Sequence, residues 1–82
     1  MDYYVPKRVN GWKRDIVIKD KGVLFIEYVN PDRNYNIVIE DWYGGYVVRK
    51  YHIRLLRNLE VKEFKSLGSA IEYAKEIMAS KN

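Results

Sequence analysis

The chain has 82 residues, 48% of them hydrophobic and 15% aromatic, so it can form one domain with a modest core without a metal or a disulfide. It contains no cysteine, which excludes disulfides, thiolate metal sites and thiol nucleophiles. The net charge of +4 comes from two basic segments, residues 1–14 and 46–57, which form a polyanion-binding patch if the fold brings them together.

The sequence also carries indications about location and source. Because no apolar run approaches the roughly 20 residues of a membrane span, and the first residues lack the layout of a secretion signal, a cytoplasmic location is expected. The chain has neither Thr nor Gln but many Lys and Glu, a bias that indicates a thermophilic source.

The first third of the chain predicts an arm followed by a strand. Residues 1–11 are expected to be an N-terminal arm, because a proline and the Asn10-Gly11 pair interrupt regular structure. Residues 12–19 then alternate, with Ile16 and Ile18 on one face, which predicts a half-buried strand.

Two further strands are expected in the middle of the chain. A turn at residues 20–22 leads into residues 23–29, which are apolar on both faces apart from Glu27 and therefore suit a central strand. The Asn- and Pro-rich residues 30–34 form the next turn, and residues 35–43 form the third strand.

A hairpin follows, with Gly44-Gly45 expected as its two-residue turn. The fourth strand starts at Tyr46 and extends as far as Leu55, and a short fifth strand is predicted over residues 59–64. The region 53–61 stays open, because its pattern also fits a turn of helix.

One helix is predicted over residues 66–80, with an apolar stripe at helical spacing. Ser66 is preferred as the N-cap over Ser69, although Ser69 and Glu72 spell a capping box. The predicted fold class is therefore α+β: an antiparallel sheet of four to five strands in residues 12–64, with one C-terminal helix packed on one face. The whole chain is expected to be a single domain.

Signals for catalysis are weak. His52 is the only histidine and has no evident partner, and the residue counts exclude a site of clustered His or Cys ligands. Glu60-Val61-Lys62, with Glu40 and Asp41 on an earlier strand, resembles the acid and E-x-K pattern of metal-dependent nucleases, but short patterns of this kind are also expected on any Lys/Glu-rich surface. We expect no enzyme activity, no metal and no cofactor.

The basic and aromatic residues favour nucleic-acid binding instead. Tyr46, Lys50, His52 and Arg54 share one strand face, taken here as the outer one, and Trp42 is expected to join them across the turn. Cations of this kind neutralise phosphates, and aromatic rings stack on bases. The candidate residues are Lys13, Arg14, Trp42, Tyr46, Arg49, Lys50, His52, Arg54 and Arg57.

A family resemblance points the same way. Residues 35–80 are predicted to form three strands followed by a helix, which is entered through Phe64-Lys65-Ser66 and continues Ala70-Ile71-Glu72-Tyr73-Ala74. In this pattern they resemble the arm-type DNA-binding modules of tyrosine integrases. The resemblance implies a three-stranded sheet that lies over a helix and reads DNA, and it assigns no residue. The strand pair at 12–29 departs from this plan.

The chain is thus expected to be a small, non-catalytic protein that binds DNA or RNA and acts as a homodimer. A regulatory role is consistent with this function. The alternative is a protein–protein interaction or self-association module that does not bind nucleic acid. Such a module would form a homodimer through a sheet face that the single helix leaves open. The apolar side chains expected on that face are Val23, Phe25, Val29, Val38 and Trp42.

Overall fold

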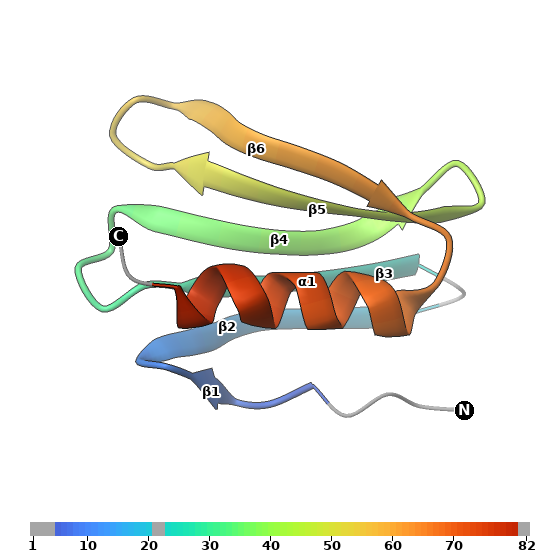
Figure 1. Cartoon of the computed structure of the whole chain (residues 1–82), viewed down its shortest axis with the longest axis horizontal. Helices are drawn as coiled ribbons and strands as arrows, with labels where there is room; N and C mark the ends of the chain where they lie inside the picture. The colour runs from blue at the N-terminus through green and yellow to red at the C-terminus, as the bar shows by residue number, and fades with distance from the viewer. Residues whose placement is uncertain (1–4, 21–22, 81–82) are drawn as a thin grey trace.

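The computed structural model describes residues 5–20 and 23–80, and it places one antiparallel sheet against a C-terminal helix (Figure 1). The strands follow one another across the sheet in chain order. They are β1 (Arg8–Val9), β2 (Trp12–Asp20), β3 (Val23–Val29), β4 (Tyr35–Trp42), β5 (Gly45–His52) and β6 (Arg57–Phe64), and the helix is α1 (Leu67–Ala79). The predicted α+β class is confirmed, but the sheet has six strands, so the prediction of four to five is wrong.

The additional strand lies within the predicted arm. Asn10 and Gly11 have φ angles of +47° and +86°, so both adopt the left-handed conformation of a two-residue hairpin turn. Val9 consequently pairs with Trp12, and the Asn-Gly pair joins two strands instead of interrupting regular structure. Residues 1–4 of the predicted arm and residues 21–22 of the predicted turn lie outside the described residues.

Two boundaries in the second half of the sheet also differ from the prediction. The β4–β5 turn is Tyr43-Gly44, with φ angles of +40° and +80°, and not Gly44-Gly45. The next strand ends at His52, and residues 53–56 form a turn before β6. The ambiguous region 53–61 is therefore a turn and the first part of a strand, without helix.

Both ends of α1 are fixed by polar contacts. At its start, the Ser66 hydroxyl accepts a hydrogen bond from the Ser69 backbone N–H at 3.2 Å, which confirms Ser66 as the N-cap. At its end, the side-chain amide of Asn10 donates to the Met78 carbonyl oxygen at 3.0 Å. The β1–β2 turn is thereby tied to the last turn of the helix.

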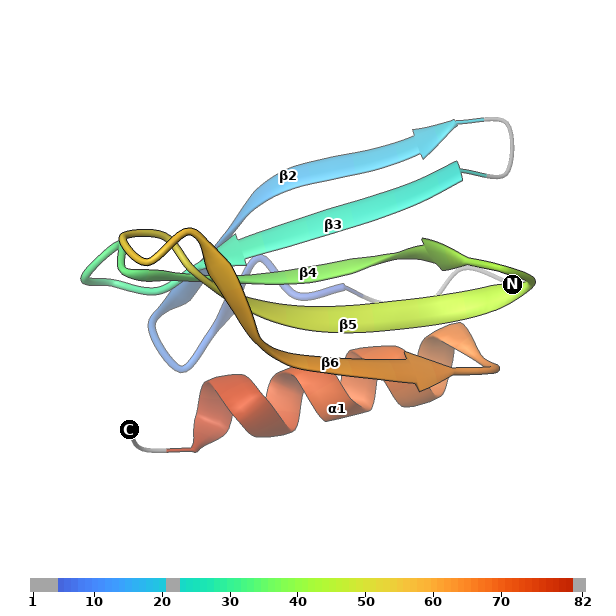
Figure 2. The same cartoon turned by 90° about the horizontal axis from the view of Figure 1, so that it is seen from above.

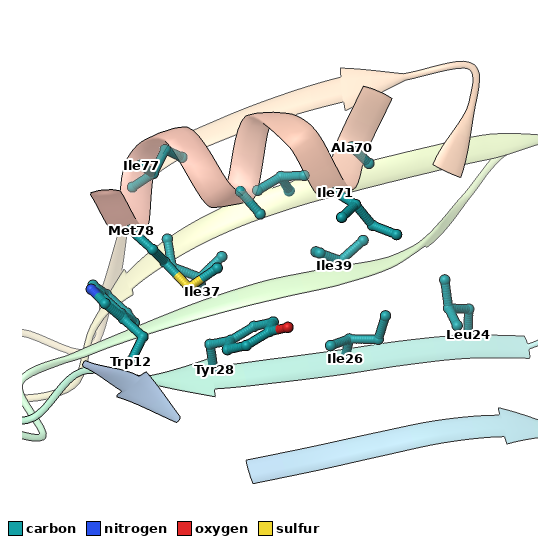
Figure 3. Packing of buried hydrophobic residues seen from close by; sticks show 12 residues of the cluster. Trp12, Leu24, Ile26, Tyr28, Ile37, Ile39, Ala70, Ile71, Ile77 and Met78 are labelled. Carbon is teal, nitrogen blue, oxygen red and sulfur yellow. The ribbon is translucent and has the colours of Figure 1, made fainter. Parts of the chain in front are cut away.

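The core lies between α1 and one face of β3, β4 and β5, as Figure 3 shows. The predicted apolar stripe of the helix packs onto the alternating apolar residues of the strands. The buried residues of this core are Trp12, Leu24, Ile26, Tyr28, Ile37, Ile39, Val48, Ala70, Ile71, Ala74, Ile77 and Met78. Figure 2 shows that the sheet carries β2 away from α1, so the helix leaves part of that strand uncovered.

Candidate nucleic-acid interface

The face of β5 that was expected to point outward lies against the helix. Val48 pairs with Ile39 and Lys50 pairs with Ile37, and both isoleucines belong to the core under α1. Tyr46 packs against the same core. The predicted orientation is wrong because β5 is apolar in both alternating sets, so its own pattern does not indicate which side the helix covers.

Lys50 is enclosed on this inner face. Only 9% of the residue is exposed, and its Nζ lies 4.9 Å from the centroid of the Tyr35 ring, a cation–π contact. Its strand-pairing partner on the neighbouring β6 is Glu60. The ammonium group is therefore directed into the protein and is not presented to a phosphate on the surface.

His52 holds the β5–β6 turn together. Its Nδ1 accepts a hydrogen bond from the Leu55 backbone N–H at 3.1 Å, so this nitrogen carries no proton in the observed arrangement. The imidazole also packs edge-on against Tyr35, with ring centroids 4.8 Å apart. Both contacts indicate that His52 stabilises the conformation of the β5–β6 turn.

Trp42 and Arg49 lie on the opposite, uncovered face of the sheet. Trp42 pairs with Gly45, so it cannot share a face with Tyr46, and it stacks edge-on with Tyr43 at the β4–β5 turn. The Arg49 guanidinium forms an ion pair with Glu40 at 2.9 Å. The aromatic and basic residues chosen from the sequence thus do not form a single surface.

The uncovered face carries apolar residues that were predicted for it, because the strand register places Phe25, Val29, Val38 and Trp42 on the side away from α1. Val38 is only 6% exposed although no helix covers it, because it lies between the register neighbours Glu27 and Arg49, whose long side chains flank it. The amide of Asn36 donates to Glu27 at 2.8 Å. Burial raises the pKa of the Glu27 carboxyl, and the nearby negative charge of Asp15 raises it further. This face therefore combines apolar side chains with the charged residues Glu27, Glu40 and Arg49.

Three turns meet instead at one end of the sheet, on the left of Figure 1. The Ile53 backbone N–H donates to the Asn34 carbonyl oxygen at 2.8 Å and joins the β5–β6 turn to the β3–β4 turn. A Cβ added to Gly11 would lie 3.1 Å from Cγ of Pro31, which places the β1–β2 turn against the same β3–β4 turn. The end of α1 is attached there through Asn10.

Exposed cations from distant parts of the sequence collect at this end of the sheet. We name them the basic end: Arg8, Lys13, Arg33, Arg54 and Arg57. Arg8 pairs with Lys13, and Arg57 pairs with His52 next to the β5–β6 turn. Asp32 is the acidic residue in the adjoining turn. Acidic residues also lie near the other end of the sheet, where Asp20 is the last residue of β2 and Asp41 precedes the last residue of β4.

The basic end contains three of the residues chosen from the sequence and two that were not on that list. Lys13, Arg54 and Arg57 are predicted candidates, whereas Arg8 belongs to the basic segment 1–14 without being a candidate and Arg33 lies outside both basic segments. Arg14 is half-buried, and its Nη1 donates to the Val5 carbonyl oxygen at 2.7 Å. The hydrogen bond between Ile53 and Asn34 brings the turn that contains Arg33 next to the turn that contains Arg54, and no local sequence pattern indicates this contact.

The nuclease-like residues do not converge. Glu40 faces the uncovered side and pairs with Arg49, whereas Asp41 accepts a hydrogen bond from the Leu24 backbone N–H on the other side. Glu60 and Lys62 both contact Tyr73 of α1. Within residues 5–20 and 23–80, no group of three or more potential metal ligands comes together.

Comparisons with known proteins add no assignment. No protein-family model, curated protein or solved structure matches the chain. Residues 35–80 do fold as three successive strands and a helix, but the resemblance to integrase arm modules stays a prediction. In the part of the chain that the structure describes, no helix has the length and apolar character of a membrane span.

Proposed function

We propose that the chain is a small, non-catalytic nucleic-acid-binding protein that contacts the phosphate backbone through its basic end. The observation that carries this proposal is the gathering of five exposed cations from three separated segments at one end of the sheet. Among the described residues, none of the five forms an ion pair. Unpaired surface cations are the groups that release counterions when they neutralise phosphates.

The shape of the basic end indicates how the nucleic acid is contacted. The cations lie on turns and strand ends, so they form a row along an edge of the molecule and not a surface that enters a groove. Phosphate contacts position a protein without reading sequence. The exposed Leu55 and Leu56, at 56% and 74%, project from the same β5–β6 turn and are placed to contact sugars or unstacked bases. We therefore expect weak sequence preference and strong salt dependence.

Fluorescence anisotropy with labelled single-stranded DNA, duplex DNA and RNA tests the proposal. The double variant Arg54→Glu and Arg57→Glu should weaken binding strongly. Loss of two phosphate contacts should also reduce the slope of log affinity against log salt by about 1.5. The control with the same charge change is Lys65→Glu with Lys75→Glu, two lysines outside the basic end, of which Lys75 forms an ion pair with Glu72 at 3.2 Å.

Equal loss of binding in the two double variants would show that only net charge matters and would contradict an interface at the basic end. Absence of binding by the wild-type chain at low salt would remove the proposal altogether. Circular dichroism of each variant confirms that a change in binding does not come from unfolding.

The second candidate function, a protein-interaction module without nucleic acid, is supported by a different observation. Large apolar side chains are exposed on β2, on β6, and at or next to the β4–β5 and β5–β6 turns. They are Ile16, Val17, Ile18, Trp42, Tyr43, Leu55, Leu56, Leu59 and Val61. A chain that forms oligomers and binds none of the three nucleic-acid probes at low salt would favour this candidate.

A further inference from the structure

Among the described residues, the outer edge of β2 has no partner strand over most of its length. β1 pairs with it only at Trp12 and Lys13, and the Arg14 backbone N–H donates to the Lys7 carbonyl oxygen at 2.8 Å. A register shift between Arg14 and Ile16 marks the point where this cover ends. From there to Asp20, no strand within the described residues pairs with the outer side of β2.

This open segment is apolar on both of its faces. Ile16, Val17 and Ile18 are consecutive β-branched residues, and they are 39%, 46% and 48% exposed. The prediction of a half-buried strand is wrong here because neither α1 nor another layer covers this corner of the sheet (Figure 2). Edge strands of monomeric proteins usually avoid such a sequence, since free backbone groups beside apolar side chains promote pairing with another chain.

The other edge of the sheet is protected in the usual way. β6 is exposed along its length, but Glu60, Lys62 and Glu63 interrupt its apolar residues. Charged side chains on an edge strand disfavour pairing with another chain. The contrast between the two edges identifies β2 as the one suited to association.

The open segment is complementary to itself in one antiparallel register. When Val17 faces Val17 of a second copy, each Ile16 faces an Ile18, and each Lys19 comes next to Asp15, the residue at the register shift of β2. The apolar residues then meet on both faces, and opposite charges close the two ends. Lys19 also has a contact within its own chain. The proposed interface therefore rests mainly on the apolar residues 16–18.

Neighbouring registers are worse. Moving the pairing by one residue places Asp15 opposite Asp20, or Arg14 opposite Lys19, depending on the direction. A parallel, in-register pairing places each charged residue against its own copy. Like charges opposite one another in a sheet are destabilising, so the charges favour the antiparallel register centred on Val17.

We propose that residues 15–19 of β2 pair with the same residues of a second copy about a two-fold axis at Val17. This contact joins two six-stranded sheets into one continuous sheet with both helices on the same side. The basic ends lie away from the axis, at opposite ends of the dimer. The dimer therefore does not depend on nucleic-acid binding, and either proposal can fail without the other.

Sedimentation velocity of the full chain without nucleic acid, at concentrations up to about 1 mM, tests the dimer. Val17→Lys should weaken dimerisation about a hundredfold, because two cations would then meet at the axis. Val61→Lys is the matched control on β6, since Val61 is 56% exposed and lies outside the interface. Because Val17 is itself nearly half exposed, both variants should fold.

A wild-type chain that stays monomeric throughout this range would overturn the proposal. So would a Val17→Lys dimer as stable as that of the wild type, or the loss of the dimer in Val61→Lys alone.

A charge exchange tests the register itself. Asp15→Lys and Lys19→Asp should each weaken the homodimer, because each places like charges at both ends of the paired segment. An equimolar mixture of the two variants should form a heterodimer, since opposite charges then face each other at both ends. A mixture that associates no better than the separate variants would contradict the antiparallel register centred on Val17.

Discussion

Gly45 occupies a position that admits no side chain. A Cβ built there would lie 2.4 Å from the Phe64 carbonyl oxygen. This oxygen belongs to the backbone of β6, so it cannot rotate away as the end of a side chain could. Gly44 differs, because its φ of +80° is strained for other residues while the space around it is open. One glycine is therefore required by close approach of β6 and the other by turn conformation.

Gly45→Ala should destabilise the fold by about 2 kcal/mol or more, because β5 and β6 must separate to admit the methyl group. Gly44→Ala should cost about 1 kcal/mol, the strain of a left-handed residue. Urea unfolding of both variants gives the two free energies. If the two losses were equal, close approach of β6 would not be the reason for Gly45.

Glu27 makes the stability of the fold depend on pH. Burial first, and the Asp15 charge second, raise the pKa of this carboxyl in the folded chain. At pH values between the ordinary and the raised pKa, Glu27 thus keeps its proton in the folded chain, whereas the unfolded chain has lost it. The contribution of Glu27 to stability consequently falls as pH rises from the ordinary range of a glutamate through its raised pKa.

Asp15→Asn should lower the pKa of Glu27, but only in part, because burial is the larger cause. Glu27→Gln keeps an acceptor for the Asn36 amide and should flatten the stability profile over the same pH range. Carbon NMR titration of the Glu27 carboxyl and unfolding at several pH values provide the two measurements. An unchanged pKa in Asp15→Asn would show that the neighbouring charge has no effect.

At the scale of elements, the stability of α1 depends on its N-cap, Ser66, which directly precedes the helix. The Ser66 hydroxyl accepts from the Ser69 N–H, whereas the Ser69 hydroxyl contacts only the Ser66 side chain. Ser66→Ala should therefore cost about 1 kcal/mol of unfolding free energy, and Ser69→Ala clearly less. Thermal unfolding followed by circular dichroism compares them, and a larger loss in Ser69→Ala would move the N-cap to that residue.

At the scale of the whole molecule, sheet and helix share one core. Trp12, 5% exposed, belongs to the same buried cluster as Met78 at the end of α1, whereas Trp42 is 41% exposed. In a Trp42→Phe variant, unfolding followed by the fluorescence of Trp12 should coincide with loss of the helix signal in circular dichroism, because neither layer keeps a core without the other. Separate midpoints for the two signals would indicate independent units.

The helix and most strands could be predicted because their signals are local. Ala70, Ile71, Ala74, Ile77 and Met78 recur at helical spacing, and all five are buried. The first strand was missed although its signal was also local, since Asn10-Gly11 is a strong hairpin turn sequence. That error came from interpreting a turn pair as a break in regular structure.

The candidate site could be predicted only in part, because it depends on contacts between turns. Arg54 and Arg57 were predicted as candidates, but Lys50 from the same segment is buried on the helix side of the sheet, and Arg33 was not predicted. Side-chain alternation tells which residues share a face of a strand. It does not tell which face another element will cover when both are apolar.

By itself, the sequence determined the order of the elements, most of their lengths and the apolar stripe of α1, because turn chemistry and hydrophobic period act over a few residues. The tertiary structure alone decided which face of β5 meets the helix, which cations gather at the basic end, and that the outer edge of β2 at Ile16–Ile18 is left uncovered. Those outcomes follow from where the one helix packs and how the turns meet, and such choices depend on residues far apart in the chain.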